Sequence, residues 1–170
     1  FLTMPPRLPD TGHINTGCQC QVCKASNFGS FVSPFSLPGY KLQVCGPVTC
    51  SSGPALVYHL TCTSGRPQCA RAHYTGSASS SNPAAKPMCL RWSNHKSHHR
   101  KGKNLCQMTN HLLTWHQDED PQQFVKITIL EACPDIQTAR EKETVWSHRL
   151  FSFYPSGLNK REEIQVTPSQ

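Results

Sequence analysis

Ten cysteines and nine histidines are the residues of this 170-residue chain that are best suited to chemistry. Three of the cysteines, Cys18, Cys20 and Cys23, lie within the short stretch GCQCQVC. A cluster of this kind is typical of a zinc clamp, a redox pair or the start of a disulfide framework. The choice among the three also bears on the compartment, because disulfides persist in oxidising surroundings.

A zinc clamp would need a second set of ligands with short spacing. Cys20 and Cys23 form one C-x-x-C pair, but no second pair has that spacing. The next candidate pairs are five and seven residues apart: Cys45 with Cys50, and Cys62 with Cys69. His95 with His98 or His99 approaches a zinc-type spacing, yet these histidines lie in a strongly charged segment. The sequence therefore predicts no metal site.

A redox pair would need its C-x-x-C at the start of a helix within a βαβ pattern, and nothing of that kind surrounds Cys20. An even number of cysteines, in a chain punctuated by 14 prolines and 10 glycines, is typical of a secreted disulfide-tied domain. We therefore expect structural disulfides, without a readable connectivity, among Cys18, Cys20, Cys23, Cys45, Cys50, Cys62, Cys69, Cys89, Cys106 and Cys133.

Catalytic motifs are weak in this sequence. No Gly-x-Ser-x-Gly elbow occurs, and His13 lies in a proline-rich segment that would hold a catalytic base poorly. The acidic run Asp118–Asp120 is interpreted as a solvated turn. We therefore expect neither an enzyme nor a cofactor.

The net charge of +7 arises from 17 basic and 10 acidic residues. Much of the excess lies in NHKSHHRKGKN, residues 94–104, which could bind a polyanion. No aromatic residue is interleaved with these charges for stacking on bases, so no nucleic-acid partner is expected. The simpler interpretation is an exposed, solvated loop.

Apolar alternation predicts strands at Ala55–Cys62 and Phe124–Leu130, and the aromatic-rich segment Thr144–Tyr154 is interpreted as a long strand. Leu105–His116 fits a helix or a buried strand, and a short helix is expected shortly after Cys133, with Pro134 at its first position. The long segment between Cys62 and Cys106 shows no strand periodicity and is interpreted as irregular.

These elements predict a mainly β fold, an antiparallel β-sandwich with long disulfide-tied loop insertions and at most short helices. Residues 1–17 would form an extended N-terminal leader and residues 18–170 a single domain. Five apolar side chains should be buried between the sheets: Val125, Ile127, Ile129, Trp146 and Leu150. No apolar run is long enough to cross a bilayer and no signal peptide is evident, so we expect a processed extracellular domain.

Several motifs occur in a recognisable order: GCQCQVC, VCGPVTC, LVYHLTCTSGRPQC, FVKITILEAC and VWSHRLFSFY. This order resembles the N-terminal receptor-binding domain of gammaretrovirus-type envelope surface subunits, including endogenous retroviral ones such as the type R group. The resemblance covers most of residues 17–154, and Trp146, Arg149 and Leu150 match a Trp-x-x-Arg-Leu strand of the leukaemia-virus envelopes. The Ser-Pro-His-Gln motif of those envelopes is missing, and only His13 is nearby.

The resemblance implies attachment to a host multi-pass membrane transporter ahead of membrane fusion, either virus entry or cell–cell fusion. It implies an extracellular location on the virion or cell surface, with the remainder of the envelope as a further partner. Anchors of protein interfaces concentrate on loops and are often aromatic residues and arginine. The candidate receptor-binding residues are therefore Arg71, His73, Tyr74, Arg91, Trp92, Lys96, Arg100 and Lys101.

Three alternatives stay open. Trp92 could be a core residue and the basic run an idle surface. The chain could be a secreted disulfide-rich host ligand or antagonist with a basic heparin-binding loop, which would lose affinity as salt rises. It could also be a secreted nuclease, which metal-dependent cleavage of a plasmid would reveal.

Overall fold

The computed structural model describes residues 30–32, 41–43, 53–82 and 86–160 of the chain. The expected leader (residues 1–17) and five of the cysteines lie outside the described residues: Cys18, Cys20, Cys23, Cys45 and Cys50. In chain order the elements are β1 (Ser30–Val32), β2 (Lys41–Gln43), β3 (Ala55–Cys62), η1 (Pro67–Cys69), β4 (His73–Ser79), α2 (Pro87–Arg100), α3 (Gln107–Trp115), η2 (Pro121–Gln123), β5 (Val125–Cys133) and α4 (Ile136–Arg149).

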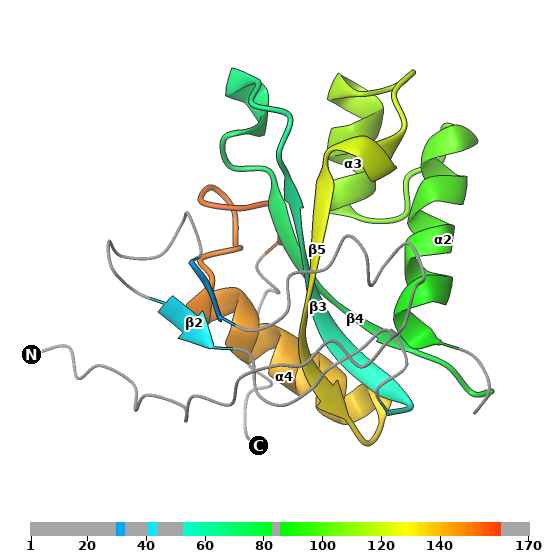
Figure 1. Ribbon diagram of the computed structural model, residues 1–170, viewed down its shortest axis with the longest axis vertical. Coiled ribbons are helices and arrows are strands. Elements are labelled where there is room, and N and C mark those ends of the chain that lie inside the picture. Colours follow the sequence, from blue (N-terminus) through cyan, green and yellow to red (C-terminus); the bar gives the residue numbers. More distant parts are fainter. Residues whose placement is uncertain (1–29, 33–40, 44–52, 83–85, 161–170) are drawn as a thin grey trace, which may run out of the picture.

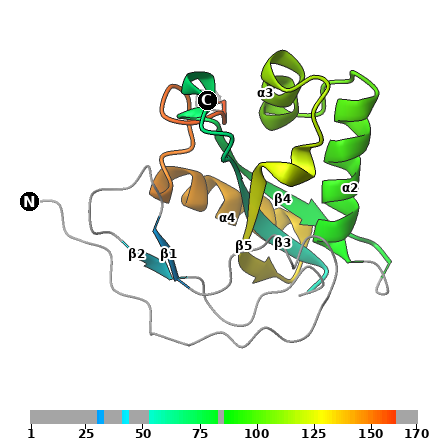
Figure 2. The same cartoon turned by 45° about the horizontal axis from the view of Figure 1, so that its top comes forward.

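A three-stranded antiparallel sheet in the order β4-β3-β5 organises the described part of the chain, and β1 pairs with β2 in a separate ribbon. The prediction of antiparallel pairing is confirmed, and so are the strands predicted at Ala55–Cys62 and Phe124–Leu130. The predicted sandwich is wrong, because helices rather than a second sheet cover the two faces (Figures 1 and 2). The domain is therefore mixed α/β.

Alternation along β3 assigns its side chains to two different cores. On one face Leu56, Tyr58 and Leu60 pack with residues of α2 and α3, namely Met88, Trp92, Met108 and Leu112. Ala55 and Val57 belong to the other face, where they pack against α4. All residues of β3 except Thr61 are buried, as expected for a central strand covered on both sides.

The α4 face contains Trp146 and Leu150, and the expected burial of both is confirmed at 2% and 0% exposure. Leu130 joins them because it follows Ile129 on β5 and therefore points to the opposite face of the sheet. Val125, Ile127 and Ile129 are also buried, on the opposite face with α2 and α3. Their burial was predicted, but their neighbours are helices and not a second sheet.

The largest local error concerns Thr144–Tyr154, which was predicted to be a strand. The helix α4 instead begins at Ile136 and continues to Arg149. Asp135 caps it, since its carboxylate accepts the Thr138 backbone N–H at 2.7 Å. Ala139, Trp146 and Leu150 recur at helical spacing and face the sheet, so their burial outweighs the β-propensity of this segment.

The interpretation of residues 62–106 as an irregular stretch is also wrong. It contains β4 and α2, and α2 and α4 are 14 residues each, so the expectation of only short helices fails. Pro87 begins α2 at a position where its missing N–H costs nothing. None of the helices in the described part of the chain is long and apolar enough to cross a membrane.

Candidate functional site

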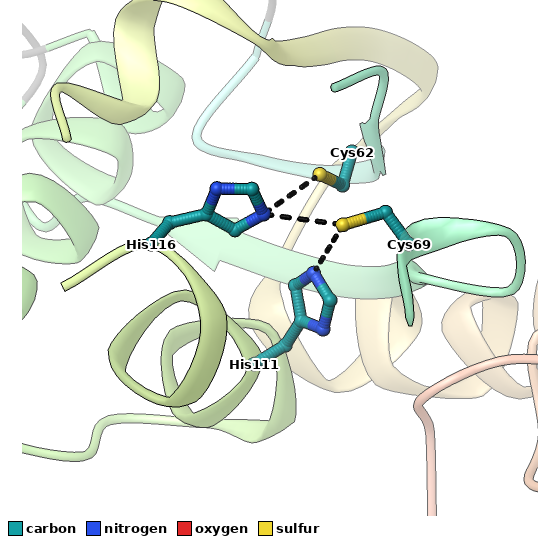
Figure 3. A group of neighbouring side chains, drawn as sticks. All are labelled: Cys62, Cys69, His111 and His116. Carbon is teal, nitrogen blue, oxygen red and sulfur yellow. Dashed lines mark hydrogen bonds between the residues drawn. The ribbon is translucent and has the colours of Figure 1, made fainter. Parts of the chain in front are cut away.

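Four buried side chains, Cys62, Cys69, His111 and His116, converge beyond one end of the sheet (Figure 3). One ligand atom from each lies within 4.8 Å of those of the other three. Cysteine thiolates and imidazoles in a buried group of four are the ligand set of structural zinc sites. We name this group the Cys2His2 cluster.

Local structure explains how the four meet. Cys62 is the last residue of β3, and Cys69 is the last residue of the short helix η1. The turn between them passes through Gly65, whose φ of +76° favours glycine. His111 lies on α3, and His116 is the residue that ends this helix.

The distances within the cluster match those of a bound zinc ion. Tetrahedral zinc with ordinary Zn–S and Zn–N bonds holds sulfur and nitrogen ligand atoms about 3.5 Å apart. The Cys62 and Cys69 Sγ atoms lie 3.5 and 3.1 Å from His116 Nε2, and Cys69 Sγ lies 3.5 Å from His111 Nε2. Three of the separations are therefore already close to those around zinc, and all of the ligand atoms lie within 4.8 Å of one another.

Residues that surround the Cys2His2 cluster also favour a metal at this position. His116 Nδ1 lies 3.4 Å from the Glu119 carboxylate, which is the carboxylate–histidine arrangement that orients zinc ligands. Arg66, within the turn between the two cysteines, donates to the same carboxylate at 2.6 Å and to the Trp115 carbonyl at 2.7 Å. These contacts tie the cysteine-bearing turn to the end of α3.

The imidazoles are in the form that binds a metal. Burial, with a smaller effect from His116, lowers the pKa of His111 to about 4. Burial also lowers the pKa of His116, although the Glu119 carboxylate opposes this shift. Burial raises the pKa of the Cys62 thiol. At neutral pH the histidines are therefore neutral, and metal binding must displace protons from the thiols.

A second polar group lies within the first core, around Tyr58 of β3. Gly76 of β4 pairs with Tyr58, and a Cβ there would lie 2.6 Å from the Tyr58 hydroxyl oxygen and 2.8 Å from Tyr74 Cε1. Glycine at this position therefore makes room for both phenol rings, whose centroids are 6.5 Å apart. The Tyr58 side chain is fully buried, and Tyr74 is 8% exposed.

Helix α2 supplies two groups to the Tyr58 hydroxyl. Arg91 Nε donates to its oxygen at 3.1 Å, and His95 Nε2 lies 3.0 Å away. The two residues are one helical turn apart, so they share one face of α2. On the far side of the His95 ring, Nδ1 lies 3.3 Å from Thr109 Oγ1 and 3.7 Å from Cys106 Sγ.

Electrostatics couple this group, which we name the tyrosine cluster: Tyr58, Tyr74, Arg91 and His95. Burial, helped by the Arg91 charge, lowers the pKa of His95 to about 3, so the imidazole is neutral. Burial raises the pKa of Tyr58, and Arg91 opposes that shift. Burial also raises the pKa of Tyr74, and the half-buried Glu143 carboxylate on α4 adds a smaller effect in the same direction on both tyrosines.

The residues predicted to bind a receptor do not form one surface. Trp92 is buried at 1% exposure and donates to Gln122 Oε1 at 2.8 Å, as the core alternative predicted. His73 is buried beside His59 on the opposite face of the sheet, with 3.0 Å between Nδ1 and Nε2. Tyr74 and Arg91 belong to the tyrosine cluster. The remaining four are exposed or half-buried: Arg71, Lys96, Arg100 and Lys101.

The predicted disulfides do not form among the cysteines of the described residues. Cys62 and Cys69 lie in the Cys2His2 cluster, and Cys133 is buried at the end of β5. Cys106 precedes α3 next to His95, and Cys89 is in the first turn of α2.

Spacing explains why the sequence did not reveal either site. The cysteines of the Cys2His2 cluster are separated by six residues, more than the two to four that zinc sites usually show. The four residues between His111 and His116 do fall in the usual range, and this pair was the available signal. For the tyrosine cluster, the sequence offers only two signals, the position of Tyr58 in the alternation of β3 and the spacing of Arg91 and His95.

The chain matches no family model, and comparisons with curated proteins and with solved structures find no significant match.

Proposed function

We propose that this domain hydrolyses phosphodiester bonds of nucleic acid at the tyrosine cluster and that zinc in the Cys2His2 cluster stabilises the fold. The observation that carries the proposal is the Tyr58 hydroxyl, contacted by the Arg91 guanidinium and by a neutral His95 imidazole at 3.1 and 3.0 Å. These two contacts hold the arginine in one orientation, and a fixed charged group is what the binding and positioning of a phosphate require.

The geometry supports a positioning role for Tyr58. Burial raises the pKa of Tyr58 and lowers that of His95 to about 3, so at neutral pH the phenol keeps its proton and the imidazole is neutral. The buried Tyr58 hydroxyl, held by His95, therefore fixes the orientation of Arg91. In the proposed step, the attacking water gives a proton to solvent and its oxygen bonds to phosphorus. The ester P–O bond breaks, and the leaving oxygen takes a proton from solvent.

Arg91 supports an anionic substrate. Its bond from Nε to Tyr58 is the only hydrogen bond that it makes within the described residues. The terminal Nη groups are therefore left for two parallel hydrogen bonds to phosphate oxygens, the geometry in which arginine binds phosphate best. The half-buried position of Arg91 places this charge between solvent and the Tyr58 hydroxyl.

Nucleic acid is favoured as the polyanion because the chain carries a net charge of +7. This departs from the sequence-based expectations of no nucleic-acid partner and no enzyme. The basic end of α2 contributes less than its composition suggests. Lys96 and Arg100 share a hollow of about 490 Å³ with Asp118, Glu119 and Asp120, which reduce its positive potential.

A cleavage assay tests the proposal. Zinc-loaded domain is incubated with supercoiled plasmid and with labelled single- and double-stranded oligonucleotides, with and without Mg²⁺ or Mn²⁺. Tyr58→Phe keeps the ring and removes the hydroxyl that holds Arg91, and it should lower the rate by about 10²-fold. Tyr154→Phe, at a position 72% exposed, is the matched control. Absence of cleavage by the parent, or equal cleavage by Tyr58→Phe, would refute the proposal.

Receptor attachment, implied by the resemblance to envelope domains, stays a prediction, together with its transporter partner and extracellular location. Of the residues expected to carry it, Arg71, Arg100 and Lys101 are exposed. Binding of the tagged domain to cells that each express one transporter would test it, and salt-insensitive binding to one cell line would favour it over heparin binding.

A further inference from the structure

The tyrosine cluster continues into α3 through a chain of hydrogen-bonding contacts. Arg91 Nε, the Tyr58 hydroxyl, His95 Nε2, His95 Nδ1 and Thr109 Oγ1 follow one another, with 3.1, 3.0 and 3.3 Å across the three contacts. Cys106 Sγ lies 3.5 Å from Thr109 Oγ1 at the far end. Tyr58, His95 and Thr109 are all fully buried, so water does not compete for these groups.

Arg91, at the start of this series of hydrogen bonds, determines which atoms donate and which accept. Arg91 can only donate, so the Tyr58 oxygen accepts. The Tyr58 proton then needs an acceptor, because a buried hydroxyl proton without one is costly. Within the described residues His95 Nε2 is the remaining partner of this hydroxyl, and it must accept. Neutral histidine carries one ring proton, which therefore lies on Nδ1 and points to Thr109 Oγ1.

We infer that the Arg91–Tyr58 contact selects the Nδ1–H tautomer of His95, and that Thr109 is the positioning residue that accepts the Nδ1 proton, stabilises this tautomer and leaves Nε2 as the acceptor facing Tyr58. The consequence for catalysis rests on the proposed function. The tautomer itself is a property of the resting protein.

The location of Thr109 links this role to the metal. Thr109 is two residues before His111 on α3, and His116 follows the end of the same helix. Zinc bound by both histidines holds α3 at a fixed distance from β3 and η1, which supply the two cysteines. Metal occupancy therefore keeps Thr109 against His95, and loss of metal disconnects His95 from its orienting partner.

Nitrogen NMR tests the inference independently of activity. In zinc-loaded, ¹⁵N-histidine-labelled protein, two-bond correlations show which ring nitrogen of His95 carries the proton, and loss of signals in His95→Gln assigns them. The parent and Thr109→Ser should show Nδ1–H, while Thr109→Val and the zinc-depleted parent should lose this preference. Cys106→Ala, which removes the more distant Nδ1 neighbour, should behave as the parent.

Kinetics supply the second measurement. Thr109→Val should lower kcat by about 10²-fold with KM nearly unchanged, whereas Thr109→Ser should restore most of the rate. An Nε2–H tautomer in the parent would overturn the inference, even if Thr109→Val fails to fold. An unchanged tautomer in folded Thr109→Val, or a shift caused by Cys106→Ala instead, would also overturn it. If the parent shows Nδ1–H but cleaves no nucleic acid, the proposed function fails and the tautomer assignment stands.

Discussion

Zinc binding to the metal-free domain should release two protons per ion. The two thiols of the Cys2His2 cluster must each lose a proton to bind, while both histidines are already neutral. Burial lowers the pKa of His111 to about 4 and lowers that of His116 below its ordinary value near 6.5, so both imidazoles are mainly neutral at pH 7 and above. One zinc ion per chain is expected.

The number of protons released distinguishes a zinc pocket that is already folded in the metal-free domain from a pocket that forms only when zinc binds. At pH 6 a preformed pocket releases two protons from the thiols, almost none from His111 and less than one from His116. In an unfolded chain each histidine would have its ordinary pKa near 6.5 and be about three-quarters protonated, so the total would be about three and a half. Since two protons compete with the metal, affinity should fall by about 100-fold for each pH unit below neutrality.

Calorimetry at pH 6 in two buffers of different ionisation enthalpy measures the number of protons released. Cys69→Ser removes a ligand and should abolish stoichiometric binding, whereas Cys133→Ser removes a buried thiol outside the cluster and should bind as the parent does. A count near three and a half would contradict the low pKa values of the imidazoles. Tight binding by Cys69→Ser would contradict the ligand assignment.

The remaining predictions concern stability, measured by urea unfolding of the zinc-loaded domain. Gly76→Ala should cost about 1–3 kcal/mol, because its Cβ would lie 2.6 Å from the Tyr58 hydroxyl oxygen; an unchanged midpoint would contradict this contact. Trp146→Ala should cost about 3–5 kcal/mol because this side chain is 2% exposed, and a loss below 1 kcal/mol would argue against the packing of α4. Burial lowers the pKa values of His59 and His73 from 6.5 to about 3 and about 4. As pH falls, these histidines are therefore protonated in the unfolded chain before they are protonated in the folded domain. Their contribution is fully present above pH 6.5 and is lost as pH falls, by up to about 1.4 kcal/mol per pH unit for each histidine between pH 6 and 4. His59→Gln should reduce this slope, and an identical slope would show that His59 is not the source.

The alternation of apolar residues was sufficient to predict two of the strands. The alternation in Ala55–Cys62 and Phe124–Leu130 predicted two neighbouring strands of the sheet, since a period of two exposes alternate side chains to opposite faces. The burial of Trp146 and Leu150 was predicted correctly even though their segment was assigned to the wrong element. Apolar side chains are buried in either element, so burial alone does not distinguish a helix from a strand.

Only the tertiary structure decided which reactive side chains meet. His116 and Cys62 are 54 positions apart, and His95 and Tyr58 are 37 apart. Their contacts depend on how α2 and α3 pack across β3, which no local period encodes. The sequence determined an antiparallel sheet, a basic chain and a rich set of cysteines. The packing of two helices on one face of that sheet placed Cys62 and Cys69, each expected to form a disulfide with a partner that could not be assigned, next to two histidines, and placed His95 on the Tyr58 hydroxyl.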